Sequence, residues 1–219
     1  MLLKELREQV LDTALRMLED GVVHGSQGNV SAIEKESQLV AITPSAIPYT
    51  RLKPEDICVV DKNGKLVEGK WKPTSEIMLH LVFYNRREDV GSVVHSHAPY
   101  STVFGVIHEP IPMVLNEAAM NLDGEVLVAP YARPGTSEVA EVTFKTMLPN
   151  RVAAVMAHHG LVTVGPDLES AYNSTIAVET TARIIIMARS MGGKIVSIDA
   201  QECSILRDMY LAYYKAKTA

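Results

Sequence analysis

The stretch VVHSHAPY, residues 93–100, places His95 and His97 on either side of one serine, directly after two β-branched valines. Such residues favour a strand, and side chains two positions apart in a strand point to the same face. Both imidazoles would therefore project from one side of the sheet, which is a chelating geometry. Local hydrogen bonding is the alternative explanation for two nearby histidines, so the pair alone leaves both readings open.

Outward from this strand, helical and strand patterns alternate and predict a single α/β domain with a sheet packed between helices. A Thr or Ser cap predicts a helix that begins near Glu76, and Asp167 opens a long helical pattern that reaches about Met191. The other predicted elements are helices over 3–18, from 99, over 137–147 and over 201–215, a hairpin in 57–67, and strands within 30–33, 38–43, 91–97, 126–130 and 152–165.

Length and composition exclude several classes of protein. The chain has 219 residues, of which 47% are hydrophobic and 21% charged, so it suits one globular domain over residues 1–219. Its net charge of -5 argues against a general nucleic-acid surface, which would be basic. No apolar run is long enough to span a bilayer, and the N-terminal segment lacks the apolar core of a secretory signal. We therefore expect a cytoplasmic protein without a membrane or nucleic-acid partner.

A second pair of histidines ends a predicted buried strand at AHHG, residues 157–160. Together with the HSH pair, either His158 or His159 could complete a face of three nitrogens around Zn²⁺ or a similar metal, with a position left for substrate. Glu76 offers an oxygen ligand. The two cysteines are far apart and outside any CxxC, so neither a disulfide framework nor a thiolate metal site is indicated.

Glycines, hydroxyls and a helix start indicate an anion site. GSQGNVS at 25–31 can bring backbone N–H groups close to a ligand, and TPSA at 43–46 places Ser45 in a tight loop. PTSE at 73–76 puts two hydroxyls at a helix N-terminus, where unpaired N–H groups and the helix dipole favour phosphate. An ordinary capping segment has the same appearance, so both readings stay open here.

Taken together, these segments resemble the class II aldolase and adducin head family, in particular the zinc-dependent L-fuculose-1-phosphate aldolases. The resemblance runs over nearly the whole chain and implies a mostly antiparallel or mixed central sheet flanked by helices. Its carriers are GNVS at 28–31, ITPSAIPY at 42–49, the helix start that ends at Glu76, HSH at 95–97, APY and GT within 129–136, and HHGL at 158–161.

The resemblance, rather than the spacing, selects a set of metal ligands and a reaction. It implies one Zn²⁺ per subunit bound by His95, His97, His159 and Glu76, with His158 outside the ligand set. The metal would act as a Lewis acid on the ketone and hydroxyl oxygens of dihydroxyacetone phosphate, and Glu76 would leave the metal to serve as the base.

The resemblance also implies a phosphate site and an assembly. The family forms homotetramers with active sites between subunits, and a tyrosine from a neighbouring subunit's tail handles a proton on the aldehyde half. Of Tyr210, Tyr213 and Tyr214, the alignment favours Tyr213. The residues implied to contact the phosphate of a small sugar phosphate are Gly28, Asn29, Ser45, Ala46, Thr74 and Ser75.

Two departures from the family pattern bear on the substrate. Ala46 stands where such aldolases tend to have glycine, and its methyl group is expected to disfavour a positive φ. Asn116 replaces the tyrosine that such aldolases place near the aldehyde, and Glu117 follows it. A carboxylate there is similar to the acid or base of sugar-phosphate epimerases and dehydratases in the superfamily, although a solvated loop acid is the plainer reading.

Three functions are compatible with these residues. The favoured one is an aldolase that cleaves a ketose 1-phosphate, such as L-fuculose 1-phosphate or a deoxypentulose 1-phosphate, to dihydroxyacetone phosphate and an aldehyde. The second is another enzyme on the same metal site, namely an L-ribulose-5-phosphate 4-epimerase, a methylthioribulose-phosphate dehydratase or a decarboxylase of a phosphorylated oxo acid. The third is a non-catalytic adducin-like module, which is disfavoured because the candidate ligands are all present.

Overall fold

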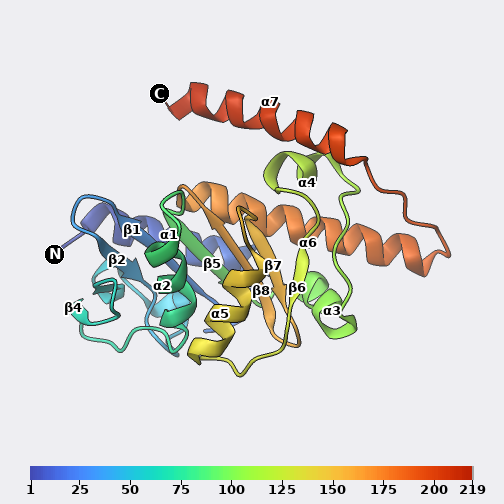
Figure 1. Cartoon of the computed structure of the whole chain (residues 1–219). Helices are drawn as coiled ribbons and strands as arrows, with labels where there is room; N and C mark the ends of the chain where they lie inside the picture. Colours follow the sequence, from blue (N-terminus) through green and yellow to red (C-terminus); the bar gives the residue numbers. More distant parts are fainter. Residues whose placement is uncertain (219) are drawn as a thin grey trace.

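A mixed eight-stranded sheet forms the middle layer of the chain in the computed structural model, which describes residues 1–218 (Figure 1). The strand order is β4-β3-β2-β1-β5-β8-β7-β6, and every pair of neighbours is antiparallel except β6 and β7. This confirms the expected α/β fold with a mostly antiparallel sheet. The strands are β1 (Asn29–Glu34), β2 (Leu39–Ile42), β3 (Cys58–Val60), β4 (Leu66–Glu68), β5 (Ser92–Ser96), β6 (Leu127–Ala129), β7 (Ala153–Met156) and β8 (Gly160–Gly165).

Helices cover both faces of the sheet (Figure 1). Successive residues of a strand point to opposite faces, and Val93 accordingly belongs to the core beneath α2 and α5, whereas Val94 belongs to the core beneath α1 and the start of α6. A third core lies under α3, α4 and the rest of α6. The helices are α1 (Lys4–Glu19), α2 (Ile77–Arg86), α3 (Pro99–Ile107), α4 (Asn116–Asn121), α5 (Ser137–Thr146), α6 (Leu168–Ser190) and α7 (Ala200–Thr218).

Two helices begin at their predicted positions, but α2 has Glu76 at its N-cap in place of the predicted Thr or Ser. The side chain of Asp167 accepts a hydrogen bond from the Ser170 backbone N–H at 2.8 Å, so α6 begins where the capping residue predicts. Helix α2 begins directly after Glu76, which holds the N-cap position. Within residues 1–218, no helix combines the length and the apolar character needed to cross a membrane.

The segment 152–165 differs from its prediction as one strand. It forms a hairpin in which β7 and β8 pair antiparallel, with Met156 opposite Gly160. His158 lies in the turn with a φ of 56°, and the His159 backbone N–H donates to the Met156 carbonyl at 3.1 Å. Two apolar runs flank the two histidines, and the turn at these histidines lets both runs bury their side chains in the same sheet. His159 therefore lies at the tip of a hairpin.

The close packing of this hairpin against β5 gives a stability prediction for Gly160→Ala. A Cβ at this position would lie 2.3 Å from the Ser96 carbonyl oxygen and 3.2 Å from the His95 ring. We expect a loss of about 1–3 kcal/mol in unfolding free energy, measured by urea denaturation, because the backbone must move. Lys194→Ala is the control because it shortens an exposed side chain in the loop after α6. A smaller loss for Gly160→Ala than for this control would contradict the packing.

Candidate metal centre

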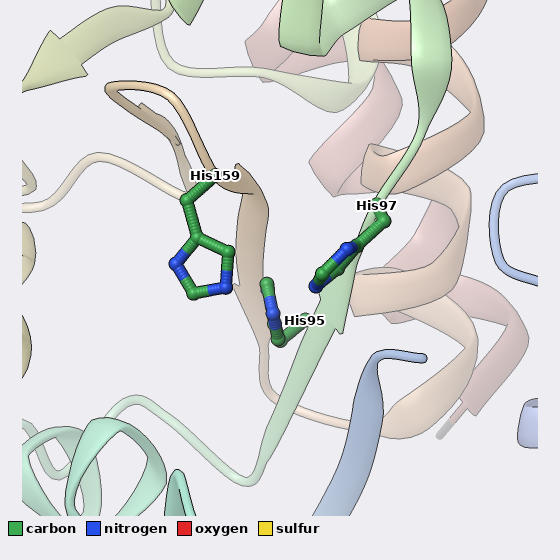
Figure 2. A group of neighbouring side chains, drawn as sticks. All are labelled: His95, His97 and His159. Carbon is green, nitrogen blue, oxygen red and sulfur yellow. The ribbon is translucent and has the colours of Figure 1, made fainter. Parts of the chain in front are cut away.

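Three imidazoles converge at the end of β5 and the tip of the β7–β8 hairpin (Figure 2). His95 lies within β5, His97 follows its end, and His159 comes from the hairpin turn. One nitrogen from each ring can serve as a ligand atom, and these three nitrogens all lie within 4.8 Å of one another. The ring centroids are 4.9–5.1 Å apart. The structure thus brings together two segments that are more than sixty residues apart in the sequence.

The carboxylate of Glu76 lies against two of these rings. Its Oε2 is 3.2 Å from His95 Nε2, and its Oε1 is 3.4 Å from His159 Nε2. The position follows from the start of α2, which places the Glu76 side chain toward β1 and β5, and Asn29 of β1 donates from Nδ2 to Oε2 at 2.9 Å. One carboxylate and three imidazoles therefore lie together in one cluster.

Several polar atoms in this cluster are buried and unpaired. Among the described residues, Glu76 Oε1, His95 Nε2 and His159 Nδ1 have no hydrogen-bond partner. Buried polar atoms are normally satisfied, so such a group of exceptions needs an explanation. His95 Nδ1 lies 3.0 Å from the Leu161 carbonyl oxygen, to which its N–H can donate, and this leaves the lone pair of Nε2 facing the cluster. The donor set fits a borderline divalent ion such as zinc.

The protonation states also suit a metal site. Burial lowers the pKa of His97 and of His159 to about 4, and the nearby His95 ring adds to the effect. Both rings are therefore neutral at neutral pH, which is the form that binds metal. Burial raises the pKa of Glu76, but the His95 ring, the Asn29 amide and the His159 ring outweigh it and hold the pKa well below its usual range. Its carboxylate is ionised.

The three predicted anion segments lie beside one another. Pro44 and Pro73 form an isolated β-bridge, and the Thr43 backbone N–H donates to the Val30 carbonyl oxygen at 3.0 Å. Gly28 has a φ of 71°, and a Cβ there would lie 2.6 Å from the His95 carbonyl oxygen, so a side chain is excluded. The segments 25–31, 43–46 and 73–76 therefore meet next to the histidine cluster.

The candidate phosphate residues differ in exposure. Ser75 and Ala46 are exposed and Ser45 is half-buried, whereas Asn29 and Thr74 are buried. The side chain of Asn29 bonds Glu76, so a contact with phosphate would have to use another atom of this residue. Ala46 has a φ of 58°, which corrects the expectation that its methyl group would disfavour a positive angle. Left-handed backbone costs a non-glycine residue about 1–2 kcal/mol, and the loop tolerates this cost.

Glu117 and Tyr213 lie on other helices. Glu117 is exposed in the first turn of α4, and Tyr213 is 60% exposed on α7. At the end of α4, the Asn121 carbonyl oxygen accepts a hydrogen bond from the Ser174 hydroxyl of α6. This contact lies near the C-terminal end of β8, whereas His159 precedes the N-terminal end of that strand. Helix α7 packs on α4. One chain alone thus keeps α4 and the adjoining part of α7 toward the opposite end of the sheet.

His80 is a buried neighbour of the cluster that the sequence motifs did not reveal. It lies one helical turn after Glu76, and its Nε2 contacts Asn29 Oδ1. Residues four apart lie on the same face of a helix, so the i, i+4 spacing from Glu76 was the available signal.

Comparison with known proteins gives a consistent set of relatives. The model of the class II aldolase and adducin N-terminal domain family matches residues 8–186. The chain is 34% identical to a 5-deoxy-D-ribulose 1-phosphate aldolase of Bacillus thuringiensis serovar kurstaki over 88% of the chain and 89% of that protein. It is 33% identical to an L-fuculose phosphate aldolase of Escherichia coli over 95% of each chain.

Two further matches extend this set. An L-ribulose-5-phosphate 4-epimerase of Salmonella paratyphi B is 30% identical over 90% of the chain and 91% of that protein. A solved structure of an L-fuculose 1-phosphate aldolase superposes with a TM-score of 0.91 at 33% identity, covering 96% of this chain and 98% of the other.

Proposed function

This chain belongs to the class II aldolase and adducin N-terminal domain family, and we propose that it is a metal-dependent aldolase of a ketose 1-phosphate. The substrate would be L-fuculose 1-phosphate or a related deoxyketose 1-phosphate, cleaved reversibly to dihydroxyacetone phosphate and an aldehyde. The observation that carries the proposal is the cluster of three imidazoles and one carboxylate with unpaired, buried ligand atoms. Relatives named as aldolases of two sugar phosphates support the choice of reaction.

The residues that would hold one Zn²⁺ per subunit are His95, His97, His159 and Glu76. A bound zinc ion would supply Lewis-acid stabilisation of negative charge that develops on the substrate oxygens. The chain's own contribution is the ionised Glu76. Its Oε1 has no hydrogen-bond partner, so in the condensation direction it can take the proton from the carbon beside the carbonyl of dihydroxyacetone phosphate. Cleavage is the reverse: the hydroxyl group beside the breaking carbon–carbon bond gives up its proton to become the aldehyde, and a proton delivered through Oε1 is added to the carbon of the dihydroxyacetone phosphate half.

We further propose that the substrate phosphate lies against the joined anion segments beside the cluster. The Ser45 and Ser75 hydroxyls, which are not fully buried, and backbone groups of Gly28 and Ala46 would contact it, with Asn29 and Thr74 behind them. A homotetramer would bring Tyr213 and Glu117 from a neighbouring subunit to the aldehyde half of the substrate. We place the enzyme in the cytoplasm, with a small sugar phosphate as its partner.

The second candidate is an L-ribulose-5-phosphate 4-epimerase or another enzyme on the same metal site. This candidate is supported by the epimerase among the relatives, which is 30% identical over most of both chains. Dehydratase and decarboxylase activities would use the same ligands. Product identity, rather than metal content, separates these reactions.

The test is metal analysis of the purified enzyme followed by incubation with dihydroxyacetone phosphate and a panel of aldehydes. We expect one divalent ion per subunit and condensation to a ketose 1-phosphate, which ceases after chelation and returns with added zinc. L-Ribulose 5-phosphate is offered in parallel. Epimerisation of this sugar without any condensation product would overturn the aldolase in favour of the second candidate.

A further inference from the structure

A continuous row of buried side chains lies behind Glu76. Helix α2 contributes Glu76, His80 and Tyr84 at intervals of four residues, and β1 contributes Asn29 and Ser31 at an interval of two. These spacings put each set on one face of its element, and the two faces meet. The Ser31 hydroxyl lies 2.6 Å from Tyr84 Oη and 2.7 Å from His80 Nδ1. His80 Nε2 contacts Asn29 Oδ1, and Asn29 Nδ2 lies 2.9 Å from Glu76 Oε2.

The chemistry of these groups gives the row one direction. An ionised carboxylate only accepts hydrogen bonds, so Asn29 must turn its Nδ2 toward Glu76 and its Oδ1 toward His80. That oxygen cannot donate, so His80 carries its proton on Nε2. The Nδ1 atom of a neutral His80 then accepts from Ser31, which in turn accepts from the Tyr84 hydroxyl. Each donor therefore points along the row toward the carboxylate.

His80 is the link that decides the orientation of the Asn29 amide. Its side chain is fully buried, and burial, followed by the His95 ring, lowers its pKa to about 3. The ring is therefore neutral at every pH at which the protein is expected to work. With the amide turned over, Asn29 Oδ1 would face the carboxylate, and two acceptors would be left in contact without a proton.

We propose that His80 is a positioning residue for Glu76: its Nε2–H fixes the Asn29 amide, which holds Glu76 Oε2 and leaves Oε1 directed at the histidine cluster. As a role in catalysis this rests on the proposed function, because Glu76 is the base only in that reaction. The hydrogen-bonding role of His80 does not depend on the proposed function, because the row of hydrogen bonds is complete without a substrate. Partners behind a metal ligand commonly change affinity or activity about 10–100-fold when they are removed.

The test compares His80→Leu with His80→Gln, whose side-chain amide can donate in place of the ring Nε2–H. We expect His80→Leu to lower kcat of the zinc-loaded enzyme about 10–100-fold with little change in KM, and His80→Gln to recover part of the loss. Zinc affinity, measured by competition with a chelator, should weaken in the same order. Thr175→Val is the matched control because Thr175 is fully buried and its hydroxyl bonds Ala171 and Thr163, which lie outside the row.

A second readout needs no activity. ¹⁵N-labelled histidine NMR of the metal-free wild-type protein should show His80 as the Nε2–H tautomer, unchanged between about pH 5 and 8, since its pKa lies well below that range. An Nδ1–H tautomer, or a kcat for His80→Leu no lower than that of Thr175→Val, would overturn the positioning role. If the wild type had no aldolase activity, the proposed function would be wrong. The tautomer of His80 and the zinc affinity of the variants would still test the hydrogen-bonded row.

Discussion

Glu76→Gln lowers the turnover of the zinc-loaded enzyme by about 10³-fold, because general acid–base catalysis contributes about 10²–10⁴-fold and an amide cannot take the proton. The variant keeps most of its zinc, since three imidazoles remain and the amide oxygen can still accept from Asn29. Turnover is measured by formation of the ketose 1-phosphate, and zinc by elemental analysis of the dialysed protein.

The control for this variant is Glu36→Gln, which removes an exposed carboxylate in the turn between β1 and β2. It should match the wild type in both measurements. Full activity of Glu76→Gln with bound zinc would eliminate Glu76 as the base. Loss of zinc together with activity would show instead that the carboxylate is needed chiefly as a ligand.

His159→Ala removes bound zinc and lowers activity by about 10³-fold or more, because Lewis-acid stabilisation supplies several kcal/mol and each 1.36 kcal/mol is tenfold in rate. The substitution takes away one of three nitrogens and leaves Glu76 Oε1 without its neighbouring ring. Zinc content per subunit and circular dichroism are measured together, so that loss of metal is distinguished from unfolding.

His158→Ala is the matched control, since it changes the adjacent histidine in the same turn. The His158 ring faces away from the cluster, and its Nε2 lies 3.0 Å from His108 Nε2. This variant should retain zinc. If His158→Ala lost the metal and His159→Ala kept it, the assignment of the third imidazole would be wrong.

Much of the fold could be predicted because the signals are local. Asp167 caps α6 through a hydrogen bond to a residue three positions later, and α2 begins after Glu76, close to its predicted start. The valines before His95 place it on a buried strand, as β-branched residues favour. The hairpin of 152–165 was missed because its two apolar runs have the pattern of one long strand, and only the turn at AHH separates them.

The site was predicted less completely, because its members meet through the sheet and not along the chain. The pattern of residues left His158 and His159 equivalent, and the resemblance alone chose between them. In the structure, the turn directs His159 to Glu76 and His158 to His108. His80 carried a weak signal, since a histidine on an apolar helix face is usually a packed core residue.

The sequence by itself determined most of the helices and strands, the pair of histidines at the end of a strand, and the family. The first two depend on residues that are neighbours in the chain, and the family depends on the order of several short motifs. Only the tertiary structure decided that Ala46 accepts a left-handed backbone and that Asn29 is held between Glu76 and His80. These outcomes depend on strand register and helix packing, which set distances between residues far apart in the chain, and no local pattern contains those distances.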